Sequence, residues 1–356
     1  MVAYFEQRKE RICRWLEALL QKKSGEFDAV NPLGRELGER LYRFAVQGKM
    51  LRGGLVCLGA GLLDCGVQCD PQAAVAAGAA MELFQSGLLV HDDIMDRDRT
   101  RRGHPTIYYQ YAQQAQRQGA RDASHLGESL GICAGDVAYF LAFEILAGPP
   151  LPAEARAGIL RLCARELAWV GVAQMQDVAW GAAQDPAAER EILRLYTYKT
   201  GRYTFSLPLM TGALLGGCGP AELAALARLG ECLGVLFQIR DDELGLFGDE
   251  RELGKPVGSD IREGKKTLFH GLLFARAPAA TAARLREIFG NPGIGEAELD
   301  FVRRQIEGLG VLGEVRTLAG GYAGEARRLI EDLPRPRAEE QRVLQELLRY
   351  TSERTR

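Results

Sequence analysis

Hydrophobic residues recur at helical spacing over most of the chain, between short polar or Gly/Pro-rich segments. From 4 to 22, Ile12, Leu16 and Leu20 share one side, as in an amphipathic helix. Similar patterns predict helices over 33–46, 128–147, 152–180 and 221–246, and a series of amphipathic helices from 267 to 356. Breaks fall at GPPLP (148–152) and near 290–295 and 334–336.

An alanine-rich helix is predicted after Asp70 and Pro71, and its end changes from apolar to charged. Residues 82–106 read ELFQSGLLVHDDIMDRDRTRRGHPT. Asp92 and Asp96 stand one turn apart on the same helix face. Burying two such anions without a cation is costly, and carboxylate oxygens with open space beside them suit Mg²⁺, which completes its shell with phosphate. A metal-bound phosphorylated ligand is therefore the first hypothesis, and the solvated end of a surface helix is the alternative.

A second stretch with the same order of features favours the metal hypothesis. Residues 236–267 read LFQIRDDELGLFGDERELGKPVGSDIREGKKT, so an apolar helix again ends in paired aspartates, Asp241 and Asp242, followed by lysines. Two such helix ends could face each other across one cavity. Metals could then hold a diphosphate from both sides.

These two stretches resemble the two aspartate-rich motifs of the trans-isoprenyl diphosphate synthases, the polyprenyl synthetase family, and supporting matches begin at Gly48. The resemblance implies an all-α bundle around a deep central cavity, usually in a homodimer, with about three Mg²⁺ ions in each active site. We read the chain as one domain over 1–356, because no linker or change of composition divides it.

The resemblance assigns one group of residues to isopentenyl diphosphate, the homoallylic substrate. Lys49 and Arg52 match the family's Gly-Lys-x-x-Arg element and would grip its diphosphate, the arginine through a bidentate fork. Being three apart at a helix start, they are expected to point to the same side. Gln85 stands where many relatives have a His, and Arg102 is the second of the family's paired arginines.

A second group is assigned to the allylic diphosphate and its metals. Gly245 stands where many relatives have a third aspartate, so Asp241 and the later Asp260 would carry the second metal site. Gln174 and Asp177 match polar residues near the allylic substrate; packing in the core is the alternative. The metal ligands by resemblance are Asp92, Asp96 and Asp241, the further catalytic residues Asp93, Arg101 and Lys199, and the further substrate-binding residues Thr200, Gln238, Lys255 and Lys265, with Lys266 less certain.

Composition argues against several other classes of protein: nucleic-acid binding, zinc-binding, secreted and membrane-spanning proteins. A net charge of −2 leaves no basic footprint for nucleic acid. The eight cysteines are scattered and lack His partners at zinc spacing, so we expect reduced, mostly buried thiols in a cytoplasmic protein. The N-terminus lacks the apolar core of a signal peptide, and glycines and Pro208 interrupt the uncharged stretch 203–221, so we expect no membrane span. Residues 108–127 are polar and are expected to form an exposed excursion.

The implied reaction joins isopentenyl diphosphate to the carbocation left when an allylic diphosphate departs, and it needs no protein nucleophile. Product length would depend on the level below Asp92, where Gly87 and Leu88 leave room and Phe84 forms a floor roughly 12 Å down, predicting about twenty carbons or more. A terpene cyclase is one alternative, although it would not need Lys49, Arg52 and Arg102. A non-catalytic subunit of such a synthase is another, although the aspartates are intact.

Overall fold

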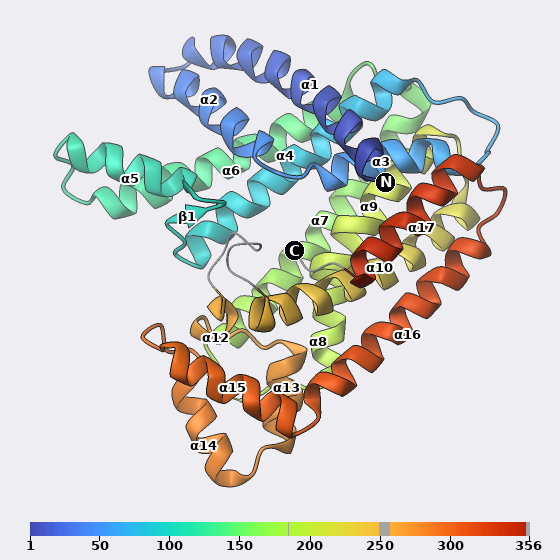
Figure 1. Ribbon diagram of the computed structural model, residues 1–356. Helices are drawn as coiled ribbons and strands as arrows, with labels where there is room; N and C mark the ends of the chain where they lie inside the picture. Colours follow the sequence, from blue (N-terminus) through green and yellow to red (C-terminus); the bar gives the residue numbers. More distant parts are fainter. Residues whose placement is uncertain (184, 249–256, 354–356) are drawn as a thin grey trace. The chain divides into compact units, whose positions relative to one another are not determined.

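The computed structural model describes residues 1–183, 185–248 and 257–353, and these residues are almost entirely helical (Figure 1). The predicted all-α fold is confirmed. Lys255, which the resemblance places on the substrate diphosphate, lies outside the described residues.

The chain divides into two compact units, each assembled from separate segments. Unit 1 comprises Met1–Cys163, Pro208–Leu223 and Arg335–Glu340, and unit 2 comprises Ala164–Leu207, Ala224–Pro334 and Gln341–Arg356. The first aspartate motif therefore lies in unit 1 and the second in unit 2. The expectation of one domain over 1–356 stays a prediction.

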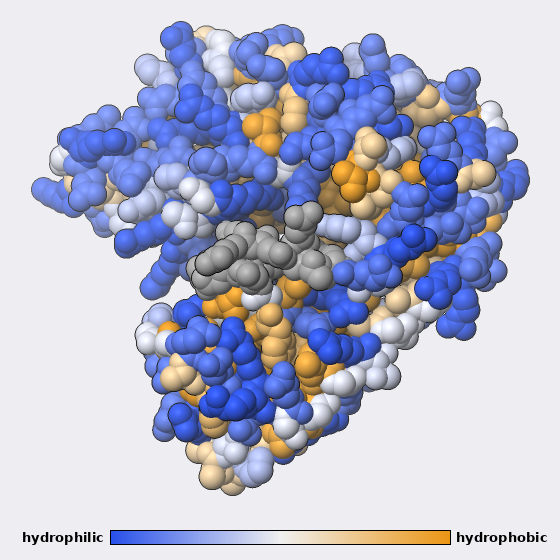
Figure 2. All heavy atoms as spheres, in the orientation of Figure 1, coloured by the Kyte–Doolittle hydropathy of each residue, from blue (hydrophilic) through white to orange (hydrophobic). Residues whose placement is uncertain are grey.

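Unit 1 is a layered set of helices with one small hairpin. Its elements are α1 (Val2–Asp28), α2 (Pro32–Val46), α3 (Leu51–Leu62), α4 (Pro71–Met95), β1 (Thr100–Arg101), β2 (His104–Pro105), α5 (Ile107–Arg117), α6 (Ala123–Ala147) and most of α9 (Leu207–Leu215). The outer faces of α1, α2 and α5 are largely hydrophilic (Figure 2), as expected for amphipathic helices.

The alanine-rich helix α4 forms the core of unit 1. The Asp70 side chain accepts a hydrogen bond from the Gln72 amide at 2.9 Å, and Pro71 fits the first helical position, where no amide donor is needed. Residues 73–84 are buried, and α4 packs against α3 and α6. This packing fixes the end of α4, where the first aspartate motif begins.

The neighbouring helix α6 is buried on one side only, so the prediction of a buried helix over 128–147 is partly wrong. Both α4 and α6 are long and apolar enough to cross a membrane by composition, but 83% of the most apolar window of α4 is buried within the structure, against 44% for α6. Phe140 on α6 is 70% exposed. Thus α4 is a core helix, whereas α6 presents an apolar outer face.

The predicted excursion over 108–127 is also largely wrong. Its first half belongs to helix α5, which packs against α6 and buries Ile107, Tyr108 and Tyr111, and its last residues belong to α6 itself. Tyr108 and Tyr111 are buried, whereas Gln110 and Gln114 are half-buried and accept hydrogen bonds from Arg40 on α2. Only 118–122 connects α5 to α6.

One disulfide corrects the prediction of reduced thiols. Cys65, in the connection from α3 to α4, bonds to Cys218, after α9, with an S–S distance of 2.15 Å. The other six cysteines are free, as expected, but only Cys163 and Cys232 are buried; Cys13, Cys57 and Cys69 are half-buried and Cys133 is exposed. The sequence suggested only the proximity of Cys65 and Cys69, whereas the fold brings together cysteines 153 positions apart.

Unit 2 contains the second motif on a long helix. Its elements are most of α7 (Ala153–Gly181), α8 (Glu189–Tyr196), the π-helix η1 (Thr197–Ser206), most of α10 (Pro220–Phe247), α12 (Ser259–Arg262), α13 (Leu268–Arg276), α14 (Ala279–Ile288), α15 (Glu296–Gly308), α16 (Val311–Glu331) and most of α17 (Ala338–Glu353). The segment Thr197–Ser206, which includes Gly201, is a ten-residue π-helix. Such segments are rare and frequently lie at functional sites.

Candidate active site

In unit 1, the first aspartate pair has one exposed and one buried member. The side chain of Asp92 is 24% exposed, whereas that of Asp93 is completely buried. Arg101 bridges them, with Nε 2.5 Å from an oxygen of Asp93 and a terminal nitrogen 3.4 Å from Asp92. Arg101 also lies 3.8 Å from Asp98.

Hairpin geometry explains how Arg101 reaches α4. Thr100 pairs with Pro105 and Arg101 with His104, and the two turn residues, Arg102 and Gly103, both have positive φ. Two such residues form the turn that best matches the strand twist. The short strands return the chain toward α4, so the local fold brings both arginines to the site.

Burial controls the charge of the first motif. It raises the pKa of Asp93 to about 7, and the guanidinium of Arg101 opposes this shift. His91 contacts α6 instead, with Nε2 3.1 Å from the Ile132 carbonyl oxygen and 3.6 Å from an oxygen of Asp136.

Two of the cations predicted to bind the homoallylic diphosphate lie near a buried carboxylate, Glu82. Glu82 on α4 accepts a hydrogen bond from the Gly53 amide at 2.8 Å. Burial raises its pKa, while Gly53, Arg52 and Arg102 oppose that shift. A Cβ on Gly48 would lie 3.1 Å from the guanidinium of Arg102, so this side chain covers the turn beside Lys49. Unit 1 therefore places two of the three predicted homoallylic cations, Arg52 and Arg102, beside Glu82.

The local geometry of Lys49 differs from the expectation. Met50 has φ 52° and caps α3, which begins only at Leu51, so Lys49 precedes the helix while Arg52 belongs to it. The two side chains do not share a helix face. A left-handed residue between them sets their directions instead.

The chain-length prediction at Gly87 is wrong in its geometry. A Cβ there would lie 2.7 Å from the Tyr139 ring and 2.9 Å from the Gly135 carbonyl oxygen, so Gly87 fills a tight contact with α6 rather than leaving an open space. Phe84 is fully buried, with its ring 5.0 Å from that of Phe143. Gln85 and Leu88 are half-buried and lie on the helix face of Asp92. Gln85 and Leu88 are therefore more accessible than Gly87 and Phe84, and the role of Leu88 in product length stays a prediction.

In unit 2, the second motif lies beside a polar cavity of about 150 Å³. Carboxylates and lysines dominate its walls, a composition suited to a metal-bound phosphate. The lining residues are Asp177, Leu195, Tyr196, Lys199, Thr200, Gln238, Asp241, Asp242, Asp260, Lys265, Lys266 and Thr267.

Most residues predicted for this half of the site meet at the cavity. Lys199 forms an ion pair with Asp177, which supports the prediction that Asp177 faces the site. The cavity lining does not include Gln174. Lys265 reaches the lining as well, where it pairs with Glu263 at 2.6 Å. These contacts place the residues, and their catalytic roles stay predictions.

Asp242 is buried and hydrogen-bonded through both oxygens. One oxygen accepts from the amide of Gln238 at 2.9 Å, and the other accepts from the hydroxyl of Tyr196. Burial and the nearby Asp260 raise the pKa of Asp242 well above its usual range, although the two hydrogen bonds oppose the shift.

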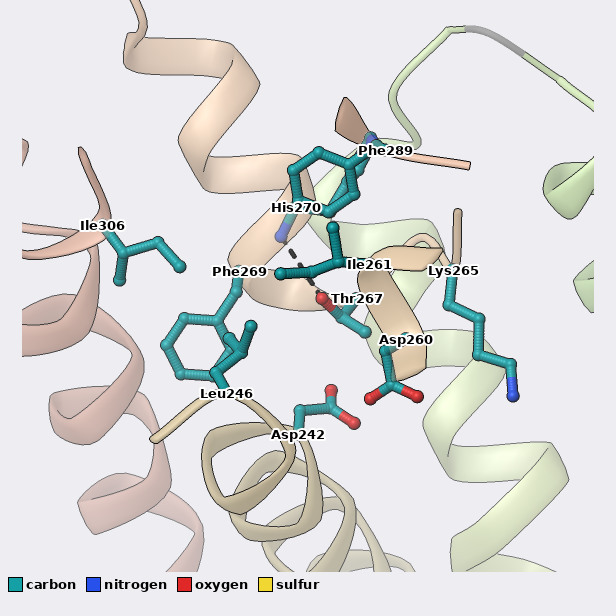
Figure 3. A pocket seen from close by; sticks show the side chains of 10 residues that line it. All are labelled: Asp242, Leu246, Asp260, Ile261, Lys265, Thr267, Phe269, His270, Phe289 and Ile306. Carbon is teal, nitrogen blue, oxygen red and sulfur yellow. Dashed lines mark hydrogen bonds between the residues drawn. The ribbon is translucent and has the colours of Figure 1, made fainter. Parts of the chain in front are cut away.

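Asp260 fills the space beside Gly245. A Cβ on Gly245 would lie 3.2 Å from an oxygen of Asp260, and the Gly258 amide donates to the Gly245 carbonyl at 2.9 Å. The two carboxylates of Asp242 and Asp260 lie near each other at one end of the pocket in Figure 3. The missing third aspartate of the motif is thus matched by a carboxylate from α12.

A water-sized pocket of about 10 Å³ continues from these carboxylates toward His270 (Figure 3). His270 packs against Phe274 and Phe289, with ring centroids 4.5 and 4.8 Å away. Burial, with a smaller contribution from Lys266, lowers the pKa of His270 to about 3. This histidine is therefore neutral near pH 7 and acts as part of an apolar cluster.

The described carboxylates fit Mg²⁺ only in pairs. Over 1–183, 185–248 and 257–353, no three His, Cys, Asp or Glu side chains form a group that could hold a metal. Mg²⁺ does not require one, because it commonly uses one or two carboxylates together with water and phosphate. The pairs Asp92/Asp96 and Asp241/Asp260 meet that requirement.

Sequence reasoning missed two buried polar residues, Glu82 and Tyr196. Glu82 opens the quoted first stretch, and Tyr196 is three residues before Lys199. The only sequence signal is that Glu82 is charged within an apolar run; Tyr196 lies in the mixed segment REILRLYTYKT and gives no such signal. Their partners, Gly53 and Asp242, are distant in sequence, so the pattern alone could not identify them.

Comparison with known proteins identifies the family. The polyprenyl synthetase family model matches residues 35–306. The chain is 36% identical over 225 residues to a short chain isoprenyl diphosphate synthase of Methanothermobacter thermautotrophicus, covering 62% of this chain and 63% of that relative. It is 30% identical over 294 residues to a geranylgeranyl diphosphate synthase of Saccharolobus solfataricus, covering 80% and 81%.

A solved structure agrees over nearly the whole length. Geranylgeranyl pyrophosphate synthase from Corynebacterium glutamicum, complexed with isoprenyl diphosphate and magnesium, aligns with a TM-score of 0.89 and 27% identity over 99% of this chain and 98% of that one. The first curated relatives are matched over less than two thirds of their length. The extent of the family match, together with the two aspartate motifs, shows that this chain belongs to the polyprenyl synthetase family.

Proposed function

We propose that this protein is a trans-prenyltransferase that condenses isopentenyl diphosphate with allylic diphosphates, head to tail, to give linear all-trans prenyl diphosphates. The observation that carries the proposal is the cavity of unit 2, where Asp241, Asp260 and Lys265 line one space. Carboxylates and lysines together suit a diphosphate bound with metal ions. Unit 1 supplies a matching set of charged groups, Asp92 and Arg101.

The residues of the chain would bind and orient the two diphosphates. Arg101, Lys199 and Lys265 hold the allylic diphosphate, and Lys49, Arg52 and Arg102 hold isopentenyl diphosphate. Asp92, Asp96 and Asp241 would hold about three Mg²⁺ ions, which neutralise the charge of the departing diphosphate when bound.

Condensation then follows from charge. Breaking the C1–O bond releases diphosphate and leaves an allylic cation, which the double bond of isopentenyl diphosphate attacks. The released diphosphate takes a proton from the new adduct, so the product gains five carbons and a new double bond. Apolar residues below Asp92, such as Leu88, keep water from the cation.

Products of about twenty carbons or longer are part of the proposal. Two half-buried residues lie on the Asp92 face of α4, Gln85 and Leu88. Neither is a bulky aromatic residue that would end elongation of the prenyl chain at a shorter product. Relatives carry the names geranylgeranyl diphosphate synthase, in Sulfolobus acidocaldarius at 39% identity, and geranylfarnesyl diphosphate synthase, in Aeropyrum pernix at 29% identity.

A homodimer in the cytoplasm completes the proposal. Large apolar side chains are exposed along α6, with Ile132 at 48% and Phe140 at 70%, and such surfaces commonly mark subunit contacts. Phe140→Asp is expected to shift the protein from dimer to monomer in light scattering. The disulfide between Cys65 and Cys218 limits the proposed location. Disulfides are uncommon in the cytosol of mesophiles and more frequent in intracellular proteins of hyperthermophiles, so a cytoplasmic location fits a hyperthermophilic host better than a mesophilic one.

The direct test is a condensation assay. Purified protein, Mg²⁺ and isopentenyl diphosphate are incubated with five-, ten- or fifteen-carbon allylic diphosphates, and product length is measured by mass spectrometry. Linear products of about twenty carbons or more are expected. Cyclic hydrocarbons formed from one substrate would instead indicate a cyclase, and no turnover until a partner protein is added would indicate a subunit of a heteromeric synthase.

A further inference from the structure

Tyr196 is a buried hydroxyl that the proposed reaction does not use. It ends α8 and is 5% exposed. Its oxygen accepts a hydrogen bond from the backbone amide of Leu268 at 3.0 Å and donates one to Asp242. One side chain therefore joins the end of α8, the second aspartate motif on α10 and the first residue of α13.

The hydrogen bonds beyond Asp242 have a fixed direction. Gln238 donates its amide N–H to Asp242 at 2.9 Å, so its carbonyl oxygen is directed to Thr200, whose hydroxyl donates to it at 2.8 Å. An amide has donors on one side and an acceptor on the other, so the Asp242 contact sets the orientation of Gln238. The hydroxyl of Thr200 therefore donates its one hydrogen bond to Gln238, inside this network.

The turn held by Tyr196 also carries cations. Lys265 and Lys266 come directly before Thr267, whose hydroxyl accepts from the His270 amide at 3.3 Å and caps α13. Because the Tyr196 contact lies at Leu268, it ties this capped turn to α10. Asp241, Asp260 and Lys265 line the same cavity as Tyr196.

We propose that Tyr196 is a positioning residue for the second aspartate motif. By bonding Asp242 and Leu268 together, it keeps Asp242 in the interior and fixes the lysine turn against α10, so that Asp241, Asp260 and Lys265 meet a metal-bound diphosphate as one rigid set. This inference rests on the proposed prenyl transfer for its ligand, but not for the contacts themselves.

Tyr196→Phe removes the hydroxyl and keeps the buried ring. It leaves the Leu268 amide and one oxygen of Asp242 short of a partner. We expect kcat to fall about tenfold and the Mg²⁺ concentration for half-maximal activity to rise severalfold, since aligned contacts to the diphosphate are lost. The KM for isopentenyl diphosphate is expected to stay within about twofold, because its predicted ligands belong to unit 1.

Tyr198→Phe is the matched control. Its ring contacts Trp169 edge-on, with centroids 5.8 Å apart, and that contact survives loss of the hydroxyl. The control should change neither the kinetic constants nor the Mg²⁺ dependence. Equal losses in both variants would overturn the proposal.

Two measurements test the link without turnover. Hydrogen exchange of the metal-free protein should show the Leu268 amide exchanging about tenfold faster in Tyr196→Phe, with the rest of α13 unchanged. Calorimetry with inorganic pyrophosphate and Mg²⁺ should show about tenfold weaker binding. Unchanged exchange and unchanged pyrophosphate affinity would show that Tyr196 only fills space in the core.

A double-mutant cycle tests the route through Asp242. If Tyr196 acts on the site through this carboxylate, Tyr196→Phe combined with Asp242→Asn should lose little more activity than Asp242→Asn alone. Losses that multiply would overturn that route. If Tyr196→Phe does not fold, Asp242→Asn alone still tests the link, with faster exchange at Leu268 as the expected result and unchanged exchange as the contrary one.

Failure of this inference and failure of the proposed function remain distinguishable. A wild-type protein without prenyl transfer would overturn the function, while exchange at Leu268 would still decide whether Tyr196 joins α10 to the lysine turn.

Discussion

The second aspartates of the two motifs, Asp93 and Asp242, are both buried but are stabilised differently. Asp93 faces the guanidinium of Arg101, whereas Asp242 is held by the uncharged groups of Tyr196 and Gln238. Unit 1 therefore uses a cation to hold its motif together. Unit 2 uses neutral hydrogen bonds.

The difference matters because the site needs its cations for diphosphate. Arg101 already contacts three carboxylates, so a ligand must share it with Asp92, Asp93 and Asp98. In unit 2, Asp242 is held by neutral groups, and the cations Lys199 and Lys265 pair with other carboxylates, Asp177 and Glu263. The first motif thus couples its own stability to ligand binding more directly than the second.

The largest expected effect separates the first aspartate of each pair from the second. Asp92→Asn and Asp241→Asn should lower kcat about a thousandfold, because each removes a charged ligand of a metal, while changing the melting temperature little. Steady-state kinetics and thermal unfolding measure both quantities. Asp98 lies outside the family pattern, so Asp98→Asn is the control and should retain activity within about threefold. Near-normal turnover in Asp92→Asn would show that Asp92 is not a metal ligand needed for the reaction.

The next effect concerns stability. Arg101→Met leaves Asp93 buried without its cation and should cost about 2–3 kcal/mol of unfolding free energy, below the usual range for a buried pair because Arg101 is partly exposed. Urea denaturation measures it. Arg99→Met, at an exposed side chain, should cost less than about 0.5 kcal/mol.

If Arg101→Met and Arg99→Met are equally stable, Arg101 does not stabilise the buried Asp93. The contrast with Asp242, which neutral groups hold, would then be wrong. Adding Asp93→Leu to Arg101→Met should recover part of the loss, because no buried charge then remains unpaired.

A pH effect of intermediate size belongs to unit 2. With a folded pKa near 3 and an unfolded pKa near 6.5, His270 binds a proton only in the unfolded state between these values, so stability falls as pH falls through this window. From pH 6.5 to 5 the loss should approach about 2 kcal/mol. The side chains of Asp242, Asp260 and Lys265 line the same pocket as His270.

His270→Phe should flatten this part of the pH–stability curve, measured by urea unfolding at several pH values, whereas the exposed His125→Asn should leave its slope unchanged. A wild-type curve that is already flat between pH 5 and 6.5 would contradict the buried neutral state.

The smallest effect concerns product length in unit 1. Leu88→Phe places an aromatic ring one turn below Asp92 and should shift products toward fifteen carbons by about tenfold in ratio, as measured by mass spectrometry. Gly87→Phe should instead lower stability by collision with Tyr139 and Gly135. A stable Gly87→Phe protein with selectively shortened products would restore the open-space interpretation of Gly87.

Local signals made much of the fold predictable. Helices such as α1, α4 and α7 follow from apolar spacing, and the break at 148–152 follows from its prolines. The motif residues were recognised because their spacing is short, as in Asp92 and Asp96. The structure places them at helix ends or beside a cavity.

The features that the sequence did not predict depend on contacts between segments that are distant in the sequence. Whether Gly87 borders space or a ring is decided by Tyr139, more than fifty residues later, and the partner of Cys65 is Cys218. The helix over 107–117 was missed because its polar face outweighed its buried tyrosines in the sequence pattern. These outcomes follow from packing, which apolar spacing within one segment does not encode.

The bond between Cys65 and Cys218 changes what limited proteolysis of this protein would reveal. It closes a covalent loop that includes the first aspartate motif, the hairpin, α5, α6, α7, α8 and η1. A single protease cut anywhere within that loop leaves both fragments attached. An electrophoresis gel without reductant would then show one band for a cleaved chain, and only a reduced sample would separate the two pieces.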